Sequence, residues 1–385
     1  MKDDTLLTHA GLDPFANHGI VNPPVYHAST VLFPTLEAWM QAKSAKVRYG
    51  RRGTPTSFAL EDAVAELEGG QGAVTTPSGL SAVTSVLLAS AKSGDHILMT
   101  DNAYQPTRYF CDTTLRRFGV ETEYYDPLAG AGIARLIRPE TSVVYVESPG
   151  SQTFEVQDLP AIAKAAHEAG VTVVADNTWG AGYYCKPLAL GADIVLQAGT
   201  KYIGGHADTN MGIVVWRDEA RHGAVRGDIQ SLGICAGPDD LYLALRGFRT
   251  MGVRLQRHYE SGLAIARWLA ERPEVSRIMH PALAGDPGHD LWQRDFTGAC
   301  GLFGFMLKTT DQAALAAMMD GLKLHGMGAS WGGFESLLIP TAPNKSRTDT
   351  RWPEKGQAMR IHVGLEDPAD LIADLEAGFN RLGKA

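Results

Sequence analysis

The middle of the chain alternates between short apolar runs and longer amphipathic stretches. Apolar and β-branched residues fill the runs that we expect to be strands, which are 96–99, 120–124, 142–147, 171–175 and 194–197. Helical periodicity fills the intervals at 80–91, 104–118 and 159–169, and Gly170 follows the last of these just before the next strand. Strands that alternate with helices are typical of a mostly parallel sheet with helices on both faces. The sequence therefore predicts an α/β fold for this region.

The two ends of the chain have different patterns. The N-terminal residues are rich in proline and show little periodicity, which favours an extended arm that contacts a neighbouring subunit. Near the other end, a long helix is predicted at 242–269, with shorter strands at 304–307 and 359–363. We therefore expect three parts, which are an arm at 1–52, a larger α/β domain at 53–246 and a smaller C-terminal α+β domain at 247–385.

The composition is that of an ordinary soluble protein. Hydrophobic residues make up 44% and charged residues 20% of the 385 positions. The net charge of -8 argues against nucleic acid as a main partner, because such partners need basic surfaces. A small anionic ligand would have to be bound by local basic groups.

The cysteines are scattered and predict neither a disulfide framework nor a metal site. Cys111, Cys185, Cys235 and Cys300 show no paired or metal-ligand spacing, so free thiols in a reducing compartment are expected. The N-terminal residues lack an apolar targeting core, and no apolar run is long enough to span a bilayer. We expect a cytoplasmic protein without a membrane partner.

Lys201 and Asp176 are the main candidates for chemistry. Lys201 lies in Asp193-Ile-Val-Leu-Gln-Ala-Gly-Thr-Lys-Tyr-Ile-Gly-Gly-His206, and Asp176 ends an earlier apolar run. A partly desolvated lysine favours the neutral amine that forms a Schiff base, and ligands of parallel sheets bind beyond the carboxyl ends of strands. A lysine with a carboxylate is typical of pyridoxal phosphate (PLP) enzymes, where they serve the aldehyde and the ring nitrogen. The alternative is an ordinary solvated lysine.

A candidate anion site lies in Gly69-Gly-Gln-Gly-Ala-Val-Thr-Thr-Pro-Ser-Gly-Leu-Ser81. A short strand is expected to meet a helix that begins near Gly79, and backbone N–H groups at such a helix end suit a phosphate. The alternative is a glycine-rich turn with a serine cap. The segment is not a Walker A loop, because no Gly-Lys-Ser/Thr follows.

Several other side chains suit a planar, anionic ligand. Tyr104 follows an expected strand and can stack on a ring or pack between helix and sheet. Tyr49, Arg51 and Arg52 can clamp a phosphate or form a solvated basic turn. Arg360 lies inside an apolar strand and needs an anionic partner, either a structural carboxylate or a substrate carboxylate.

Taken together, these motifs resemble the PLP-dependent enzymes of cysteine and methionine metabolism nearly from end to end. The segment around Lys201 is similar to the lysine signature of that family. Other similar strings are Tyr49-Gly-Arg-Arg-Gly-Thr54, Glu147-Ser-Pro-Gly-Ser151, Asp176-Asn-Thr-Trp179, Ser330-Trp-Gly-Gly-Phe-Glu-Ser336 and Arg360-Ile-His-Val-Gly-Leu-Glu-Asp367. The resemblance implies fold type I, with a central mostly parallel sheet, helices on both its faces and a smaller C-terminal α+β domain. PLP would bind in the domain at 53–246.

The resemblance also assigns roles at the cofactor ring. Lys201 would bind the PLP aldehyde and later remove the substrate α-proton. Asp176 would pair with the ring nitrogen, and Tyr104 would stack on the ring. No metal ion is implied.

The phosphate of the cofactor would be held by residues from two subunits. Gly79 and Leu80 would offer backbone N–H groups, and Thr200 would offer its hydroxyl. Tyr49 and Arg51 would reach the phosphate from a neighbouring subunit. The resemblance therefore implies a homo-oligomer with shared active sites, and a tetramer built from two such dimers.

The substrate implied is a small thioether amino acid. Arg360, with Ser330 and Trp331, would hold the substrate α-carboxylate. Within the family, the strings are most similar to those of bacterial carbon–sulfur β-lyases. This implies an enzyme of methionine biosynthesis that cleaves L-cystathionine to L-homocysteine, pyruvate and ammonia by α,β-elimination.

Three departures from the family pattern separate β-chemistry from γ-chemistry. Many γ-enzymes resemble one another in having asparagine where this chain has Ser151, and methionine γ-lyases place a cysteine where it has Pro106. Ala198 stands where relatives often have serine, so one phosphate contact is absent. The alternatives are a cysteine-S-conjugate or cystine β-lyase, a γ-elimination enzyme, and a regulatory protein that binds PLP without turnover.

Overall fold

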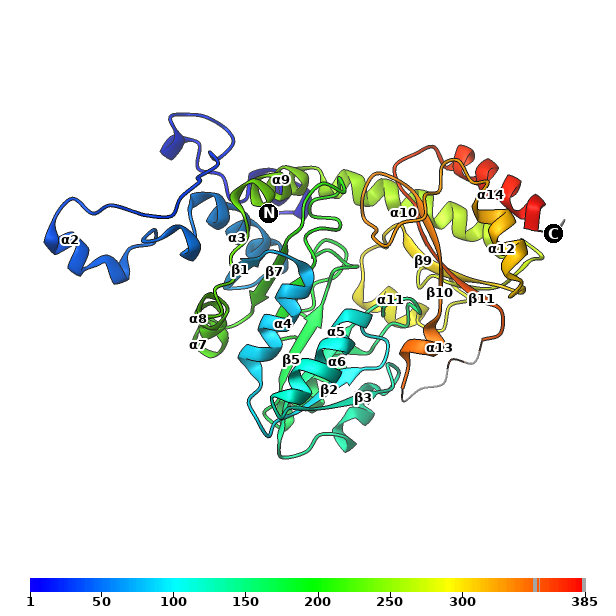
Figure 1. Ribbon diagram of the computed structural model, residues 1–385, viewed down its shortest axis with the longest axis horizontal. Coiled ribbons are helices and arrows are strands. Elements are labelled where there is room, and N and C mark those ends of the chain that lie inside the picture. The colour runs from blue at the N-terminus through cyan, green and yellow to red at the C-terminus, as the bar shows by residue number, and fades with distance from the viewer. Residues whose placement is uncertain (349–351, 353, 383–385) are drawn as a thin grey trace.

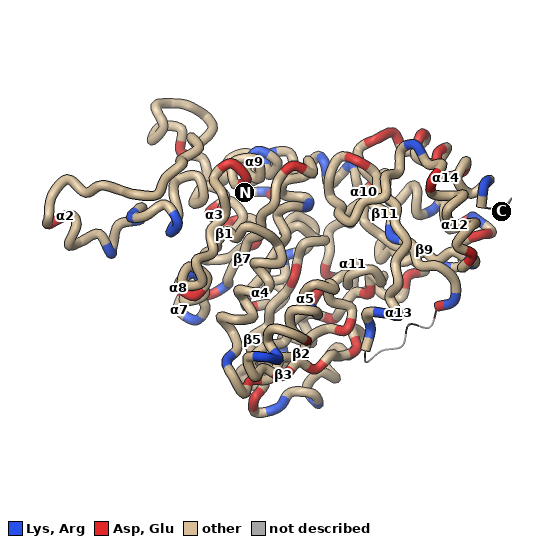
Figure 2. Tube along the Cα trace, in the orientation of Figure 1, with Lys and Arg blue, Asp and Glu red and all other residues tan. Residues whose placement is uncertain are grey.

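The computed structural model describes residues 1–348, 352 and 354–382. A larger part and a smaller part, each built around its own sheet, are joined by the long helix α10 (Met251–Ala270), and an N-terminal segment extends away from both (Figure 1). Lys and Arg are interspersed with Asp and Glu along both parts (Figure 2). No helix among the described residues is long and apolar enough to cross a membrane.

Seven strands form the larger sheet, in the order β1-β7-β6-β5-β4-β2-β3. The pairs from β6 to β3 are parallel, whereas β7 runs antiparallel to both β6 and β1. The strands are β1 (Gly72–Thr76), β2 (His96–Thr100), β3 (Glu121–Tyr125), β4 (Thr141–Glu147), β5 (Thr172–Asp176), β6 (Ile194–Gln197) and β7 (Gly212–Trp216). The mostly parallel sheet is confirmed, and each strand predicted for it is found within one residue of its expected bounds.

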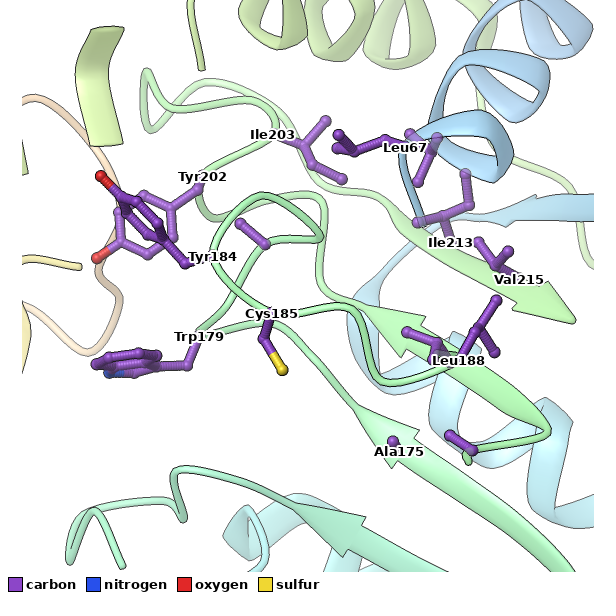
Figure 3. Packing of buried hydrophobic residues seen from close by; sticks show 14 of the residues in the cluster. Leu67, Ala175, Trp179, Tyr184, Cys185, Leu188, Tyr202, Ile203, Ile213 and Val215 are labelled. Atoms are coloured by element: carbon purple, nitrogen blue, oxygen red, sulfur yellow. The ribbon is translucent and has the colours of Figure 1, made fainter. Parts of the chain in front are cut away.

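Helices cover both faces of this sheet because neighbouring residues of each strand point to opposite sides. Ile97 packs in one cluster with Val83 of α4, whereas the next residue, Leu98, packs in another with Leu60 of α3. Figure 3 shows part of the cluster that contains Leu98 and Leu60, with Ile213 of β7 near the end of α3. The helices of this part are α3 (Pro55–Glu68), α4 (Gly79–Ser90), α5 (Gln105–Phe110), α6 (Leu159–Glu168), α7 (Glu219–His222), α8 (Ala224–Ser231) and α9 (Pro238–Arg249). Helices on both faces, as predicted, are confirmed.

The smaller part is an antiparallel sheet with helices, in the strand order β10-β11-β9-β8. Phe303, Phe305 and Met359 pack in a third hydrophobic cluster with Leu371 and Phe379 of the last helix. Its elements after α10 are β8 (Val275–Met279), α11 (His289–Asp295), β9 (Leu302–Leu307), α12 (Gln312–Met319), β10 (Leu337–Thr341), α13 (Pro343–Ser346), β11 (Gln357–His362) and α14 (Pro368–Leu382). The smaller α+β unit is confirmed, although the sequence did not predict β8, β10 or α14.

Two predicted helices differ from the structure. The single helix expected at 242–269 is wrong, because the chain leaves helical geometry at Thr250 (φ -109, ψ 7) between α9 and α10. Helix α9 packs closely on the turn at Gly204. A Cβ added to Gly247 would lie 2.1 Å from the Gly204 carbonyl oxygen. The helix expected at 104–118 is α5 followed by a π-helical segment at Cys111–Leu115.

The N-terminal residues divide into two stretches. Helix α1 (Asp3–His9) packs on its own chain, since Leu6 and Leu7 are buried. The stretch that carries α2 (Leu36–Met40) extends away from the rest of the molecule (Figure 1). The arm at 1–52 and the domain boundaries at 53–246 and 247–385 remain predictions.

Candidate active site

A cavity of about 220 Å³ lies where the carboxyl ends of the larger sheet's strands face β11 of the smaller sheet. Residues of both the larger and the smaller part line the cavity, so both parts are needed to form it. Of the residues predicted for the site, those lining it are Gly79, Leu80, Tyr104, Asp176, Thr200, Lys201, Trp331 and Arg360.

Lys201 lies in a tight turn just after β6. The Gly205 N–H donates to the Lys201 carbonyl at 2.7 Å, and the Lys201 N–H donates to the Ala198 carbonyl at 3.0 Å. The Lys201 amine donates to the Ser330 hydroxyl at 2.6 Å. Burial and, after it, the nearby Arg360 charge lower the Lys201 pKa to about 8. A substantial fraction of this amine is therefore neutral near physiological pH, as a nucleophile requires.

Asp176 ends β5 and is held by several donors. Its Oδ1 accepts from the Thr178 N–H at 2.9 Å and from the Thr178 hydroxyl at 2.6 Å, and its Oδ2 accepts from the Tyr145 hydroxyl at 3.4 Å. The Thr178 hydroxyl also accepts from the Ala198 N–H at 2.9 Å. Thr178 thus links Asp176 directly to the turn that carries Lys201.

Glu147 is a second carboxyl beside Asp176, since the two are partners in the register of β4 and β5. Burial, and then the Asp176 charge, raise the pKa of Glu147 well above its ordinary value. Burial also raises the Asp176 pKa, but its hydrogen bonds from Thr178 and Tyr145 oppose that shift. Among the described residues, the Glu147 carboxyl accepts from the Tyr104 N–H alone, at 2.7 Å. We infer that Glu147 holds the proton and Asp176 the charge, because donors favour the ionised carboxyl that they contact.

The cavity wall also contains the N-terminus of α4, where backbone N–H groups have no intrahelical acceptor. The Ser78 side chain caps this end by accepting from the Ser81 N–H at 3.1 Å. An added Cβ on Gly79 would lie 2.4 Å from the Cβ of Ala198, so only glycine fits there. Gly79 and Leu80 line the cavity, so this helix end offers N–H groups to an anion bound there.

Thr200 lines the cavity, but its hydroxyl already has partners. It donates to the Met211 carbonyl at 3.2 Å and accepts from the Met211 N–H at 3.0 Å. To donate to a phosphate, the Thr200 hydroxyl would have to share its proton with the Met211 carbonyl or give up that hydrogen bond. The predicted phosphate contact of Thr200 stays a prediction.

Arg360 enters the cavity from β11. Its Nη2 donates to the Ser330 carbonyl at 3.2 Å, while the Ser330 hydroxyl contacts Lys201. Burial lowers the Arg360 pKa. Within the part of the chain that the structure describes, no carboxylate forms an ion pair with Arg360, which leaves its charge for an anionic ligand. Tyr104 lies across the cavity and is 47% exposed.

Tyr49 and Arg51 do not reach this cavity within one chain. They line a separate hollow of about 360 Å³ beside α8, where Arg51 donates to the Gln230 carbonyl at 2.6 Å. Tyr49 is 44% exposed. A role for these residues at the phosphate thus depends on a second subunit.

Sequence reasoning missed several residues of the site. Glu147, Tyr145 and Thr178 surround Asp176, and Gln152 lines the cavity from the loop after β4. A hydroxyl two positions after Asp176 was a usable signal, since Ser and Thr often hydrogen-bond a preceding aspartate. The pairing of Glu147 with Asp176 depends on strand register, which local patterns do not give.

The arrangement fits PLP. The amine with its lowered pKa suits the aldehyde, and the Asp176 carboxyl, whose donors favour its ionised form, suits a protonated ring nitrogen. The start of α4 lies on the cavity wall, where its N–H groups suit a phosphate. Among the described residues, no group of three or more His, Cys, Asp or Glu side chains could hold a metal ion.

Comparisons with known proteins agree with this fit. A family model described as Cys/Met metabolism PLP-dependent enzyme matches residues 4–380. A putative cystathionine β-lyase of Rhizobium johnstonii is 50% identical, over 98% of this chain and 95% of the relative. A cystathionine β-lyase of Escherichia coli is 43% identical over 99% of both chains. The solved structure of a cystathionine γ-synthase of Xanthomonas oryzae pv. oryzae, in complex with aminoacrylate and cysteine, superposes with a TM-score of 0.93 at 32% identity, covering 100% of this chain and 99% of that one.

These matches confirm the predicted fold type I and the use of PLP, and they extend over nearly the whole chain. The protein belongs to the family of PLP-dependent enzymes of cysteine and methionine metabolism.

Proposed function

We propose that this enzyme is a carbon–sulfur β-lyase that converts L-cystathionine and water to L-homocysteine, pyruvate and ammonia. The observation that carries the proposal is the Lys201 amine, which has a pKa of about 8 and shares one cavity with Asp176 and Arg360. Relatives named cystathionine β-lyase, at 43% and 50% identity, support the choice of substrate.

Arg360 and Lys201 have different tasks in this reaction. Bound PLP would supply a sink for the negative charge that Cα gains when its proton leaves. Arg360 binds the substrate α-carboxylate, and Ser330 and Trp331 help to place it. The neutral Lys201 amine takes the proton from Cα. The electron pair of that C–H bond then forms a Cα–Cβ double bond as the Cβ–S bond breaks and the thiolate leaves.

The remaining contacts hold the cofactor. Asp176 would pair with the ring nitrogen and Tyr104 would stack on the ring. Gly79 and Leu80 would bind the phosphate through their N–H groups, with Thr200 beside them. These roles match the positions of the residues on the cavity wall.

The keto acid released distinguishes this function from its alternatives. We expect the purified enzyme to form pyruvate and homocysteine in equal amounts from L-cystathionine. Cleavage on the γ side would give 2-oxobutanoate and cysteine instead. Faster turnover of L-cystine would favour a cystine lyase, and bound PLP without any elimination would favour a regulatory protein. L-Methionine serves as the control substrate, because it has no sulfur on Cβ.

We also propose a homo-oligomer, namely a tetramer built from dimers. The segment that carries α2 exposes the large apolar side chains of Leu32 (88%) and Leu36 (75%), and exposed apolar side chains of this size favour a subunit contact (Figure 1). Tyr49 and Arg51 at its base would then complete the phosphate site of a neighbouring subunit.

Sedimentation equilibrium tests the assembly. Because each chain has a mass of 41.4 kDa, we expect a species of four chains at micromolar concentration. A stable dimer would keep the shared site and contradict the tetramer. A monomer with full activity would contradict both. We propose a cytoplasmic location as well, since a reducing compartment suits the free cysteines.

A further inference from the structure

Gln152 is a polar residue of the cavity wall whose amide oxygen lacks a partner. Its side chain belongs to the lining of the cavity that contains Lys201. The Oε1 atom is buried and accepts no hydrogen bond from any residue that the structure describes. Buried amide groups in folded proteins are almost always hydrogen-bonded, so a ligand that supplies the missing partner would be favoured.

The backbone holds Gln152 in a conformation that it would not adopt freely. Its φ is 65, which is in the left-handed region, and Phe154 in the same loop has a φ of 58. Non-glycine residues in this region carry strain, persist only where their surroundings impose it, and gather at functional sites.

The surroundings of the loop do impose its shape. The Ser151 N–H donates to the Asn102 carbonyl at 2.9 Å, which fixes the loop to the end of β2. Glu155 accepts from the Asn102 amide at 3.1 Å and from Arg347 of the smaller part at 2.5 Å. The loop is thus held by contacts to both the larger and the smaller part, which fixes the place of Gln152 on the cavity wall.

Gln152 and Arg360 line the same cavity, and Phe154 of the loop approaches the strand that pairs with β11. Gly304 of β9 is the register partner of Arg360, and an added Cβ on Gly304 would lie 3.0 Å from the Phe154 ring. Arg360 is assigned to the α-carboxylate of the substrate and Lys201 to Cα. The roles proposed for the described residues leave the polar groups of cystathionine beyond the sulfur atom without a partner.

We propose that the Gln152 amide hydrogen-bonds the polar end of the substrate beyond the sulfur atom. An amide can turn to present either its oxygen or its NH₂ group, so it suits the ammonium and carboxylate groups found there. Gln152 thereby favours thioethers whose leaving thiol carries an amino-acid group over simple S-alkyl cysteines. This inference rests on the proposed function.

The test compares two substrates in the wild-type enzyme and in Gln152→Met. Methionine has nearly the same length as glutamine but no amide. L-Cystathionine carries the distant polar groups, and S-ethyl-L-cysteine has the same reacting end without them. Because a hydrogen bond to a charged group is lost, we expect kcat/KM for cystathionine to fall by about tenfold or more, mainly through KM. Turnover of S-ethyl-L-cysteine and the visible absorption of the bound cofactor should stay near wild-type values.

Gln152→Asn is the matched control, because it keeps an amide and tolerates a left-handed φ. It should restore part of the preference for cystathionine. Equal losses for both substrates, or an unchanged ratio, in a folded Gln152→Met that binds PLP would overturn the role of Gln152 alone. A wild-type enzyme that releases pyruvate from neither substrate would instead overturn the proposed function, and this role with it.

Discussion

Replacing Lys201 with alanine is expected to abolish turnover and covalent attachment of the cofactor. The Lys201 amine is the group in the cavity with a pKa of about 8, so it can both bond an aldehyde and take a proton from Cα. Positioned general acid–base groups alone contribute roughly 10²–10⁴-fold to rate, and this variant loses a covalent anchor as well. Activity on L-cystathionine should therefore fall by more than about 10³-fold.

Two measurements separate lost chemistry from lost folding. Borohydride followed by mass spectrometry should fix PLP to the wild-type chain at Lys201 and leave the alanine variant unmodified, while circular dichroism stays unchanged. Lys186→Ala is the control, because Lys186 is also half-buried but hydrogen-bonds the Leu67 carbonyl and pairs with Asp3 away from the cavity. A folded Lys201→Ala enzyme with substantial turnover would refute the assignment.

The sequence predicts those residues of the cavity that lie at the carboxyl ends of strands. Parallel strands bring their carboxyl ends to one edge, so Asp176 and Lys201, at the ends of two apolar runs, are expected to share one crevice, and both line the cavity. Tyr104 follows the same rule after β2. Arg360 could be placed only by family resemblance, because it comes from a separate sheet more than 150 positions along the chain.

What could not be predicted depends on contacts between distant segments. Strand β7 pairs with both β1 and β6, and its own apolar run does not say which neighbours it has. The break at Thr250 leaves apolar periodicity intact on both sides, so the pattern reads as one helix. Two features of the cavity likewise depend on the folded structure. They are the unpartnered Oε1 of Gln152 and the pairing of Glu147 with Asp176.

Asp176→Asn and Glu147→Gln are expected to differ sharply in kcat. Both variants replace one of the two neighbouring carboxyls by its amide. Asp176 accepts from Thr178 and Tyr145, which favours its ionised form, whereas burial and the Asp176 charge raise the Glu147 pKa well above its ordinary value and favour its protonated form. An amide at 176 has no charge to keep a ring nitrogen protonated. Loss of one preorganised electrostatic contact typically costs about 10²–10³-fold in kcat, and we expect a loss of that size in Asp176→Asn.

Glu147→Gln replaces a neutral group by a neutral group of the same shape, and its carbonyl oxygen can still accept from the Tyr104 N–H. Its kcat should stay within about threefold of wild type, since a replacement that keeps both the neutral charge and the hydrogen bond costs little. Both variants should bind PLP, which visible absorption and reduction onto Lys201 would report. Near-normal turnover in Asp176→Asn would contradict its role at the ring nitrogen. A large loss in Glu147→Gln with Asp176→Asn active would mean that the charge resides on Glu147, because only the ionised member of the pair can balance a cationic ring.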